Sequence, residues 1–93
     1  MNIFSSLRIY AGKWSEKAVE AFTPEEIALV DKAEVVESNF GMSVCFFMRK
    51  GGQTYIPLDQ NCSASIGDAV DLTKATVVTL QKQGEDDIYR VRI

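Results

Sequence analysis

Residues 42–58, MSVCFFMRKGGQTYIPL, decide the fold of this chain. The even positions from 42 to 48 are all apolar, whereas the odd positions carry serine, cysteine and phenylalanine. Alternation of this kind is typical of a β-strand with one buried face. The stretch Gln53–Leu58 alternates in the same way, with its apolar side at Thr54, Ile56 and Leu58. The glycines between the two runs predict a β-hairpin.

Two registers fit the glycine pair that joins these strands. A two-residue turn at Gly51-Gly52 would continue the apolar face of one strand into the mixed face of the other. A three-residue loop, Lys50-Gly51-Gly52, instead pairs Phe46 with Ile56 and keeps one face dry. We therefore predict the three-residue loop.

The predicted register also fixes the outer face of the hairpin. It sets Phe47 opposite Tyr55 and Arg49 opposite Gln53, with Lys50 at the loop. Two aromatic rings and two basic groups would then share one surface. The alternative is that the aromatic-rich N-terminal segment covers Phe47 and Tyr55, because a small domain rarely leaves aromatic side chains in solvent.

The residues before the hairpin predict a helix, a strand and a turn. Thr23–Glu26 reads Thr-Pro-Glu-Glu, which places threonine at the N-cap, proline at the first helical position and a glutamate that closes a capping box. We expect one short helix near residues 24–31. Residues 33–38 then favour a strand, and Asn39–Gly41 predicts a turn.

The residues after the hairpin predict a short strand and a second hairpin. Ile66–Leu72 opens with a Gly-Asp turn that leads into a short strand. Ala75–Gln81 and Asp87–Ile93 then pair around Gln83–Asp86, whose acidic residues mark an exposed tip.

The apolar residues of this second hairpin indicate its pairing. Setting Val78 opposite Val91 makes one apolar face and turns Arg90 and Arg92 to the other side. These arginines either belong to a binding surface or form a solvated strand face that discourages edge pairing.

The segment Ile3–Phe22 has the weakest pattern. Leu7–Tyr10 predicts a strand, and Ser15–Phe22 predicts a helical turn or two capped by Ser15. Lys13 and Trp14 add a basic group and an indole that either join the hairpin surface or, in the case of the indole, pack internally.

The composition indicates one small domain and excludes many kinds of site. The chain has 93 residues, of which 46% are hydrophobic, so we expect a single core at 23–93 with 1–22 as an N-terminal extension beside it. The absence of histidine removes His-dependent triads and His-containing zinc sites. Cys45 and Cys62 are expected as free thiols, since a reducing cytosol keeps cysteines unpaired; the alternative is a disulfide, which needs their Cα atoms within about 7 Å.

These observations also limit the expected cofactors, partners and location. We expect no membrane partner, because no apolar run approaches the roughly 18 residues of a membrane span. We also expect no cofactor, no metal and no catalytic residues, because the chain has no histidine and its two cysteines lack the spacing of a metal site. The chain is predicted to be cytoplasmic. Adjacent acids such as Asp86-Asp87 are explained by solubility rather than by general acid–base catalysis.

The net charge of −3 is unevenly distributed along the chain. Residues 23–38 carry five acidic side chains against one lysine, whereas 39–60, which include the hairpin, carry two basic side chains against one acid. An acidic chain has no general affinity for nucleic acid, but a locally basic face is compatible with it.

The order of elements over residues 33–93 resembles an oligonucleotide/oligosaccharide-binding (OB) fold. The resemblance lies in the strand order, the hairpin 42–58 and the Ile66-Gly67-Asp68 entry to a strand. It implies a mainly β, five- to six-stranded small barrel of antiparallel hairpins. In that family the hairpin of the second and third strands is the usual nucleic-acid face, which implies that role for 42–49 and 53–58.

The chain also resembles bacterial and phage single-stranded-DNA-binding proteins of this fold. Unlike them it ends on the predicted strand Ile88–Ile93 rather than on an acidic, glycine-rich tail. The resemblance therefore implies strand binding by the barrel and not recruitment of partners through a tail.

We therefore expect a non-enzymatic domain that binds single-stranded nucleic acid, in the first place DNA. Bases stack on aromatic rings, at about 1–3 kcal/mol per base, while basic groups follow the phosphates. The candidate residues are Phe47, Arg49, Lys50, Gln53, Tyr55, Lys13, Trp14, Arg90 and Arg92. The alternative is a protein-interaction or assembly module, such as a homo-oligomer, built on the aromatic first 22 residues and the acidic stretch Glu25–Glu37.

Overall fold

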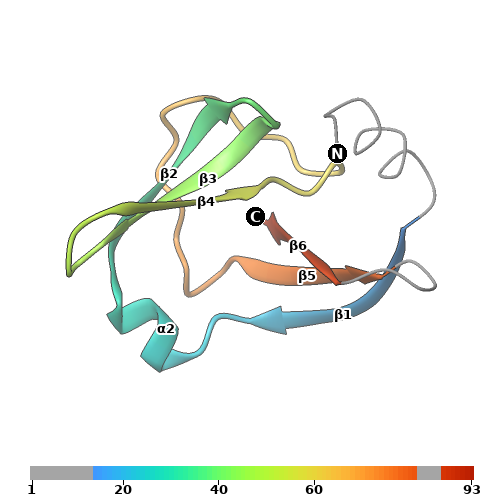
Figure 1. The fold of residues 1–93 in the computed structure, drawn as a ribbon, viewed down its shortest axis with the longest axis horizontal. Coiled ribbons are helices and arrows are strands. Elements are labelled where there is room, and N and C mark those ends of the chain that lie inside the picture. The colour runs from blue at the N-terminus through green and yellow to red at the C-terminus, as the bar shows by residue number, and fades with distance from the viewer. Residues whose placement is uncertain (1–13, 82–86) are drawn as a thin grey trace.

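The computed structural model describes residues 14–81 and 87–93, which form six strands and one short helix (Figure 1). The elements in chain order are β1 (Ser15–Ala21), α2 (Pro24–Ala28), β2 (Val30–Ser38), β3 (Gly41–Met48), β4 (Gln53–Pro57), β5 (Thr76–Gln81) and β6 (Ile88–Arg92). The strands make two three-stranded antiparallel sheets, ordered β1-β5-β6 and β2-β3-β4. The mainly β class is confirmed. The predicted strand Leu7–Tyr10 and the tip Gln83–Asp86 lie outside the described residues.

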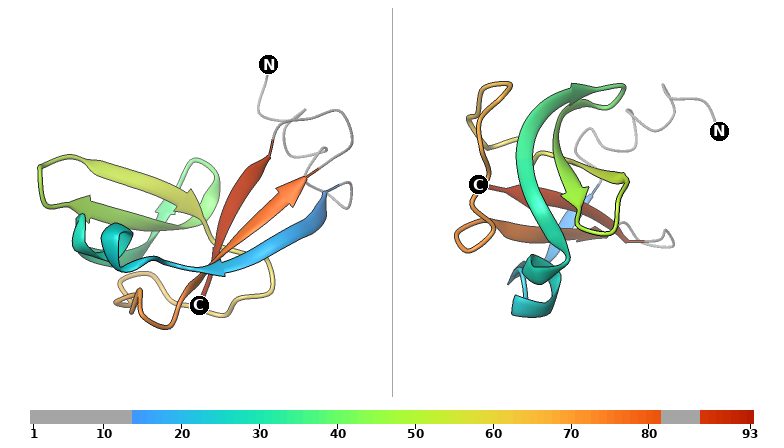
Figure 2. Two further views of the ribbon diagram at one scale, coloured as in Figure 1. Left: turned by 90° about the horizontal axis from the view of Figure 1, so that it is seen from below. Right: turned by 90° about the vertical axis from the view of Figure 1, so that its left-hand side faces the viewer.

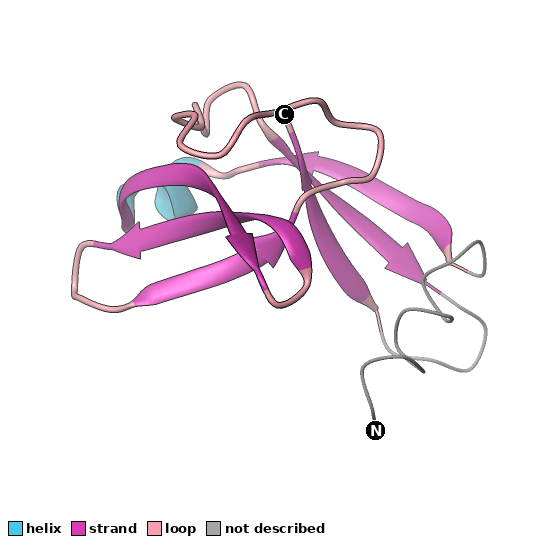
Figure 3. Cartoon of the chain, turned by 90° about the horizontal axis from the view of Figure 1, so that it is seen from above, coloured by secondary structure: helices cyan, strands magenta, loops and turns pink. Residues whose placement is uncertain are grey.

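The two sheets meet where β4 ends. Leu58 pairs with Val91 in parallel, and the Asp59 N–H donates to the Val91 carbonyl at 2.8 Å. The sheets turn away from each other at this junction, and β2 curves strongly along its length (Figure 2). The long loop 58–75 crosses from one sheet to the other (Figure 3).

The predicted Gly-Asp turn supplies a short third pairing to the β2-β3-β4 sheet, at the free edge of β2. The Val35 N–H donates to the Asp68 carbonyl at 2.9 Å, and the Gly67 N–H donates to the Val35 carbonyl at 2.8 Å. The short strand predicted within Ile66–Leu72 is not formed; this segment makes only an isolated bridge between Ala69 and Glu34. Within residues 14–81 and 87–93, no strand pairing joins this segment to β1, so hydrogen bonds do not close the strands into a barrel.

The core lies between the two sheets and contains the predicted apolar face of the first hairpin. Val44 and Phe46 of β3 are buried together with Val35 of β2, and Leu58 and Val91 close the core at the sheet junction. Burying such side chains away from water is the main favourable contribution to folding. The even-numbered face of 42–48 is therefore the inner face, as the alternation predicts.

The start of α2 follows the predicted capping box. The Thr23 Oγ1 accepts from the Glu26 N–H at 3.1 Å, and the Glu26 Oε1 accepts from the Thr23 N–H at 2.9 Å. The end was predicted wrongly, because the helix stops at Ala28 rather than near residue 31. The helix ends early because Val30 is the first residue of β2 and pairs with Met48 of β3.

The predicted helical turns over Ser15–Phe22 are wrong. Residues Ser15–Ala21 form β1, in which Val19 pairs with Val78 of β5. The Ser15 hydroxyl does not cap a helix but donates to the Gln81 carbonyl at 3.0 Å. Pairing with a strand that is distant in sequence outweighs local helix propensity here.

The first hairpin has a register that differs from the predicted one by two residues. Phe46 pairs with Thr54 rather than with Ile56. The loop begins one residue earlier, since the Met48 N–H donates to the Gly52 carbonyl at 3.1 Å, and both loop glycines have positive φ. A shift of two residues leaves every side chain on its predicted face.

The second hairpin has a register that differs by one residue, and its predicted faces are therefore wrong. Arg90 pairs with Val78 and Arg92 with Thr76, so both arginines share a face with Val78. This register lets Val91 enter the core, while the Arg92 side chain reaches the carboxylate of Asp59.

Candidate functional site

The outer face of the β3–β4 hairpin carries two aromatic rings joined by a polar residue. Phe47 lies directly across from Gln53, and the Tyr55 hydroxyl donates to the Gln53 Oε1 at 2.7 Å. Phe47 is half-buried, whereas 51% of Tyr55 is exposed. The two rings are diagonal neighbours across the strands rather than the directly opposed pair that the sequence predicts, and diagonal positions are within reach of aromatic side chains.

Lys32 adds a positive charge to this face, and the sequence reasoning missed it. Lys32 pairs with Phe47 on the neighbouring strand β2, and its Nζ lies 4.6 Å from the centre of the Phe47 ring. A cation over an aromatic face is attracted by the ring quadrupole. The alternation of β2 was the available signal, because Lys32 and Phe47 both occupy outward positions.

Cys45 belongs to this face but is buried. It is 1% exposed and has Glu34 and Tyr55 as its cross-strand partners. Interaction with the Cys45 thiol raises the pKa of Tyr55 above its ordinary value. Both Cys45 and Cys62 are free thiols.

Arg49 does not lie with the aromatic rings. Its N–H donates to the Leu29 carbonyl and its Nε donates to the Ala28 carbonyl, each at 3.0 Å. Its Nη1 also lies 3.6 Å from the Asp31 carboxylate. Arg49 therefore fastens the end of α2 to the end of β3. Lys50 is exposed at the hairpin loop.

Trp14, Arg90 and Arg92 gather at a separate site, lining a pocket of about 190 Å³ with Asp59 and Glu16. The Arg92 Nε donates to the Asp59 Oδ2 at 2.8 Å and its Nη1 to the Glu16 Oε1 at 3.2 Å. These bonds, with Glu16 as the larger contribution, raise the pKa of Arg92 further above its ordinary value.

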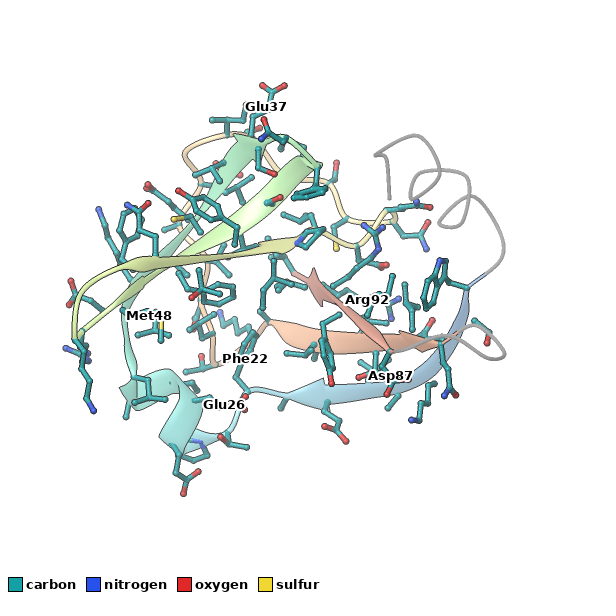
Figure 4. All side chains as sticks on the ribbon, in the orientation of Figure 1. Phe22, Glu26, Glu37, Met48, Asp87 and Arg92 are labelled. Carbon is teal, nitrogen blue, oxygen red and sulfur yellow. The ribbon has the colours of Figure 1, made fainter. Side chains whose placement is uncertain are left out.

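The candidate residues of the sequence therefore divide between two places. Figure 4 shows Arg92 on one side of the molecule and Met48, at the end of β3, on the other. Arg90 also has a carbonyl partner, since its Nη1 donates to Leu58 at 3.2 Å. Lys13 lies outside the described residues.

Two further surface features were not expected from the sequence. Phe40, in the turn between β2 and β3, is 62% exposed and lines a pocket with Tyr55. An apolar groove of about 180 Å³ lies between α2 and the inner faces of β3 and β4. Its lining residues are Phe22, Glu26, Leu29, Val30, Phe46, Met48, Thr54 and Ile56.

Comparison with protein-family models, with curated proteins and with solved structures found no match to this chain. Fold and site together define a small, mainly β domain with two aromatic side chains on the outer face of the β3–β4 hairpin. Across the described ranges, no group of three or more Asp, Glu or Cys side chains has the arrangement of a metal site. The same residues contain no helix that is long and apolar enough to cross a membrane.

Proposed function

We propose that the outer face of the β3–β4 hairpin binds single-stranded nucleic acid, in the first place DNA, without catalysing a reaction. The exposed ring of Tyr55 beside Phe47 is the observation that carries this proposal. Every nucleobase has a π-face, so stacking on such rings is tolerant of sequence.

Two ammonium groups against the one carboxylate of Glu34 give this face a small positive excess, which supports binding of a polyanion. Lys32 stands over Phe47, and Lys50 is exposed in the loop between β3 and β4. In the proposal these ammonium groups contact phosphates while Tyr55 stacks on a base. Gln53, whose Oε1 accepts from the Tyr55 hydroxyl, offers its amide N–H groups for hydrogen bonds to base edges.

Arg49, Arg90 and Arg92 have structural roles in this proposal. Each guanidinium donates to an acceptor of the protein itself, so releasing it to a phosphate would break an existing contact. The proposed surface is therefore smaller than the set of residues that the sequence suggests.

The proposal extends to the architecture. We propose that the two sheets act as an open OB-like barrel, with β3 and β4 as the counterpart of the hairpin by which OB domains hold nucleic acid. The sheet junction at Leu58 and Val91 supports this view, because it continues the curved β2-β3-β4 sheet into β6.

The apolar groove favours a second candidate function, self-association of two copies. The strand β4 is at the edge of its sheet. Because hydrogen-bonded and non-hydrogen-bonded pairs alternate along an antiparallel pair of strands, the N–H and C=O groups of Tyr55 point away from β3, toward the open edge. Two copies paired through β4 would bring both grooves, each with its half-exposed Leu29, next to the interface.

Fluorescence anisotropy with labelled oligothymidylate at low and moderate salt distinguishes the two functions. Nucleic-acid binding predicts saturable binding that weakens with salt and falls by about 5- to 150-fold in Tyr55→Ala. Ile66→Ala is the control, because Ile66 is at least as exposed as Tyr55 but lies outside the hairpin. No binding at micromolar protein, together with a dimer in sedimentation, would reject this function in favour of self-association.

A further inference from the structure

A second aromatic ring stands near Tyr55, at the turn between β2 and β3. Phe40 is 62% exposed, the largest exposed fraction among the large apolar side chains of the described residues. Phe40 and Tyr55 line one pocket of about 320 Å³ with Glu37, Ser38 and Asn39. This volume is at the lower end of the range of small-molecule sites, about 300–1,000 Å³.

The turn that carries Phe40 is held by hydrogen bonds. The Phe40 N–H donates to the Ser38 Oγ at 3.1 Å, and that oxygen lies 2.8 Å from the Oγ of the buried Ser43. Gly41 closes the turn with a φ of +87°, a conformation that residues with a Cβ rarely adopt. The backbone that positions the Phe40 ring is therefore fixed before any ligand arrives.

The lining of this pocket fits a planar heteroaromatic ring better than an aliphatic chain. Two aromatic side chains supply stacking surfaces, and Ser38 and Asn39 add polar groups at the same pocket. A nucleobase needs both, because its faces stack while its edge carries donors and acceptors. The Ser38 hydroxyl is already engaged within the turn, so Asn39 is the polar residue that an aliphatic side chain of a protein partner would leave without a use.

The Glu37 carboxylate does not change this assignment. Figure 4 shows the Glu37 side chain pointing away from the body of the molecule. Because Glu37 lines the pocket, its carboxylate would repel a phosphate placed there, whereas a neutral ring carries no such penalty.

We propose that the Phe40–Tyr55 pocket holds one unpaired nucleobase and so makes the protein select single strands over duplexes. This proposal rests on the proposed function, since the strand must first lie on the β3–β4 face. A base inside a duplex is stacked and paired on both sides, and extracting it costs a few kcal/mol. The Phe40 turn would therefore add a site that accepts an unpaired base and excludes a base that is paired in a duplex.

The test uses the full chain and a labelled oligothymidylate that carries 2-aminopurine at one internal position, single-stranded or annealed to its complement. Stacking of 2-aminopurine on an aromatic ring quenches its fluorescence. We expect wild type to quench it in the single strand only. In Phe40→Ala we expect affinity to fall by about 5- to 150-fold and the quenching to be lost, with Phe40→Leu weakened in the same direction.

The variants separate the pocket from the wider function. Because Phe40 is exposed, Phe40→Ala should keep the thermal midpoint of wild type, which circular dichroism checks. Binding and quenching by Phe40→Ala equal to those of wild type would overturn the pocket while leaving the β3–β4 surface in place. Absence of binding by wild type itself would reject the proposed function, and the pocket with it.

Discussion

The Nζ of Lys32 on β2 lies 4.6 Å from the centre of the Phe47 ring on β3. The two residues are cross-strand partners, so the charge is fixed next to the aromatic face by sheet register rather than by a flexible loop. One face of the Phe47 ring is thereby occupied, which leaves Tyr55 as the more accessible ring of the hairpin.

Replacing Lys32 should change the salt dependence of binding. If its ammonium group contacts one phosphate of a single strand, Lys32→Gln lowers the slope of log K against log salt by about 0.7. The measurement is a salt series of anisotropy titrations with oligothymidylate. Lys74→Gln is the control, because Lys74 is exposed in the turn before β5 and should leave the slope unchanged. Equal slopes for wild type and Lys32→Gln would remove Lys32 from the surface.

Two acidic partners of Arg92 should contribute unequally to stability. Asp59 is buried, whereas nearly half of the Glu16 side chain is exposed, and exposed ion pairs contribute little. We expect Asp59→Ala to lower the thermal midpoint by about 4–8 °C, as a loss of about 1 kcal/mol does in a domain of this size. Glu16→Gln should change it by less. Thermal unfolding followed by circular dichroism compares them, and equal effects would contradict the assigned role of Asp59.

The N-cap of α2 offers a test of the local structure. Thr23→Ala removes the acceptor of the Glu26 N–H and should lower the free energy of unfolding by about 1 kcal/mol. Thr23→Ser keeps the hydroxyl and should keep most of the stability. Urea unfolding curves of the three proteins give the comparison, and the prediction fails if serine is as damaging as alanine.

Asp71 should contribute a pH-dependent part of the stability. Hydrogen bonds from the Thr73 hydroxyl and the Thr73 N–H lower the pKa of Asp71 in the folded state. A carboxyl with a lowered folded-state pKa stabilises the fold at neutral pH and loses that contribution as the pH falls below about 4. In Asp71→Asn the urea midpoint should therefore fall less between pH 6 and pH 3 than in wild type. Parallel falls would show that Asp71 has no such role.

The sequence predicted faces better than pairings in the first hairpin. In residues 42–48 every even-numbered position is apolar. A register that exposed Val44 and Phe46 would therefore be unstable, and this identifies the inner face. Registers that differ by two residues share that parity. The choice between them depends on where the loop begins, which the positive-φ glycines Gly51 and Gly52 allow at more than one position.

The second hairpin could not be predicted from its own residues. Apolar side chains occupy both parities, with Val77 beside Val78 and Ile88 beside Tyr89, so burial alone does not select a register. The observed register is accompanied by contacts between residues distant in sequence. Arg92 donates to Asp59, and Val91 pairs with Leu58.

The candidate site was predicted in part for a related reason. Phe47, Gln53 and Tyr55 follow from alternation, and the structure brings them together. Lys32 lies in a stretch of mostly acidic residues, so net charge gives no sign of a basic group on the outer face, where the structure places it. Phe40 belongs to a turn, where no periodicity indicates which way a ring points.

The central claim is that single-stranded nucleic acid lies on the outer face of β3 and β4. The most direct measurement is a titration of ¹⁵N-labelled protein with oligothymidylate, followed by amide chemical shifts. Saturable shifts centred on Phe47, Gln53 and Tyr55 are the predicted result. Shifts confined to the groove around Leu29 and Met48, or none at saturating oligonucleotide, would contradict the account.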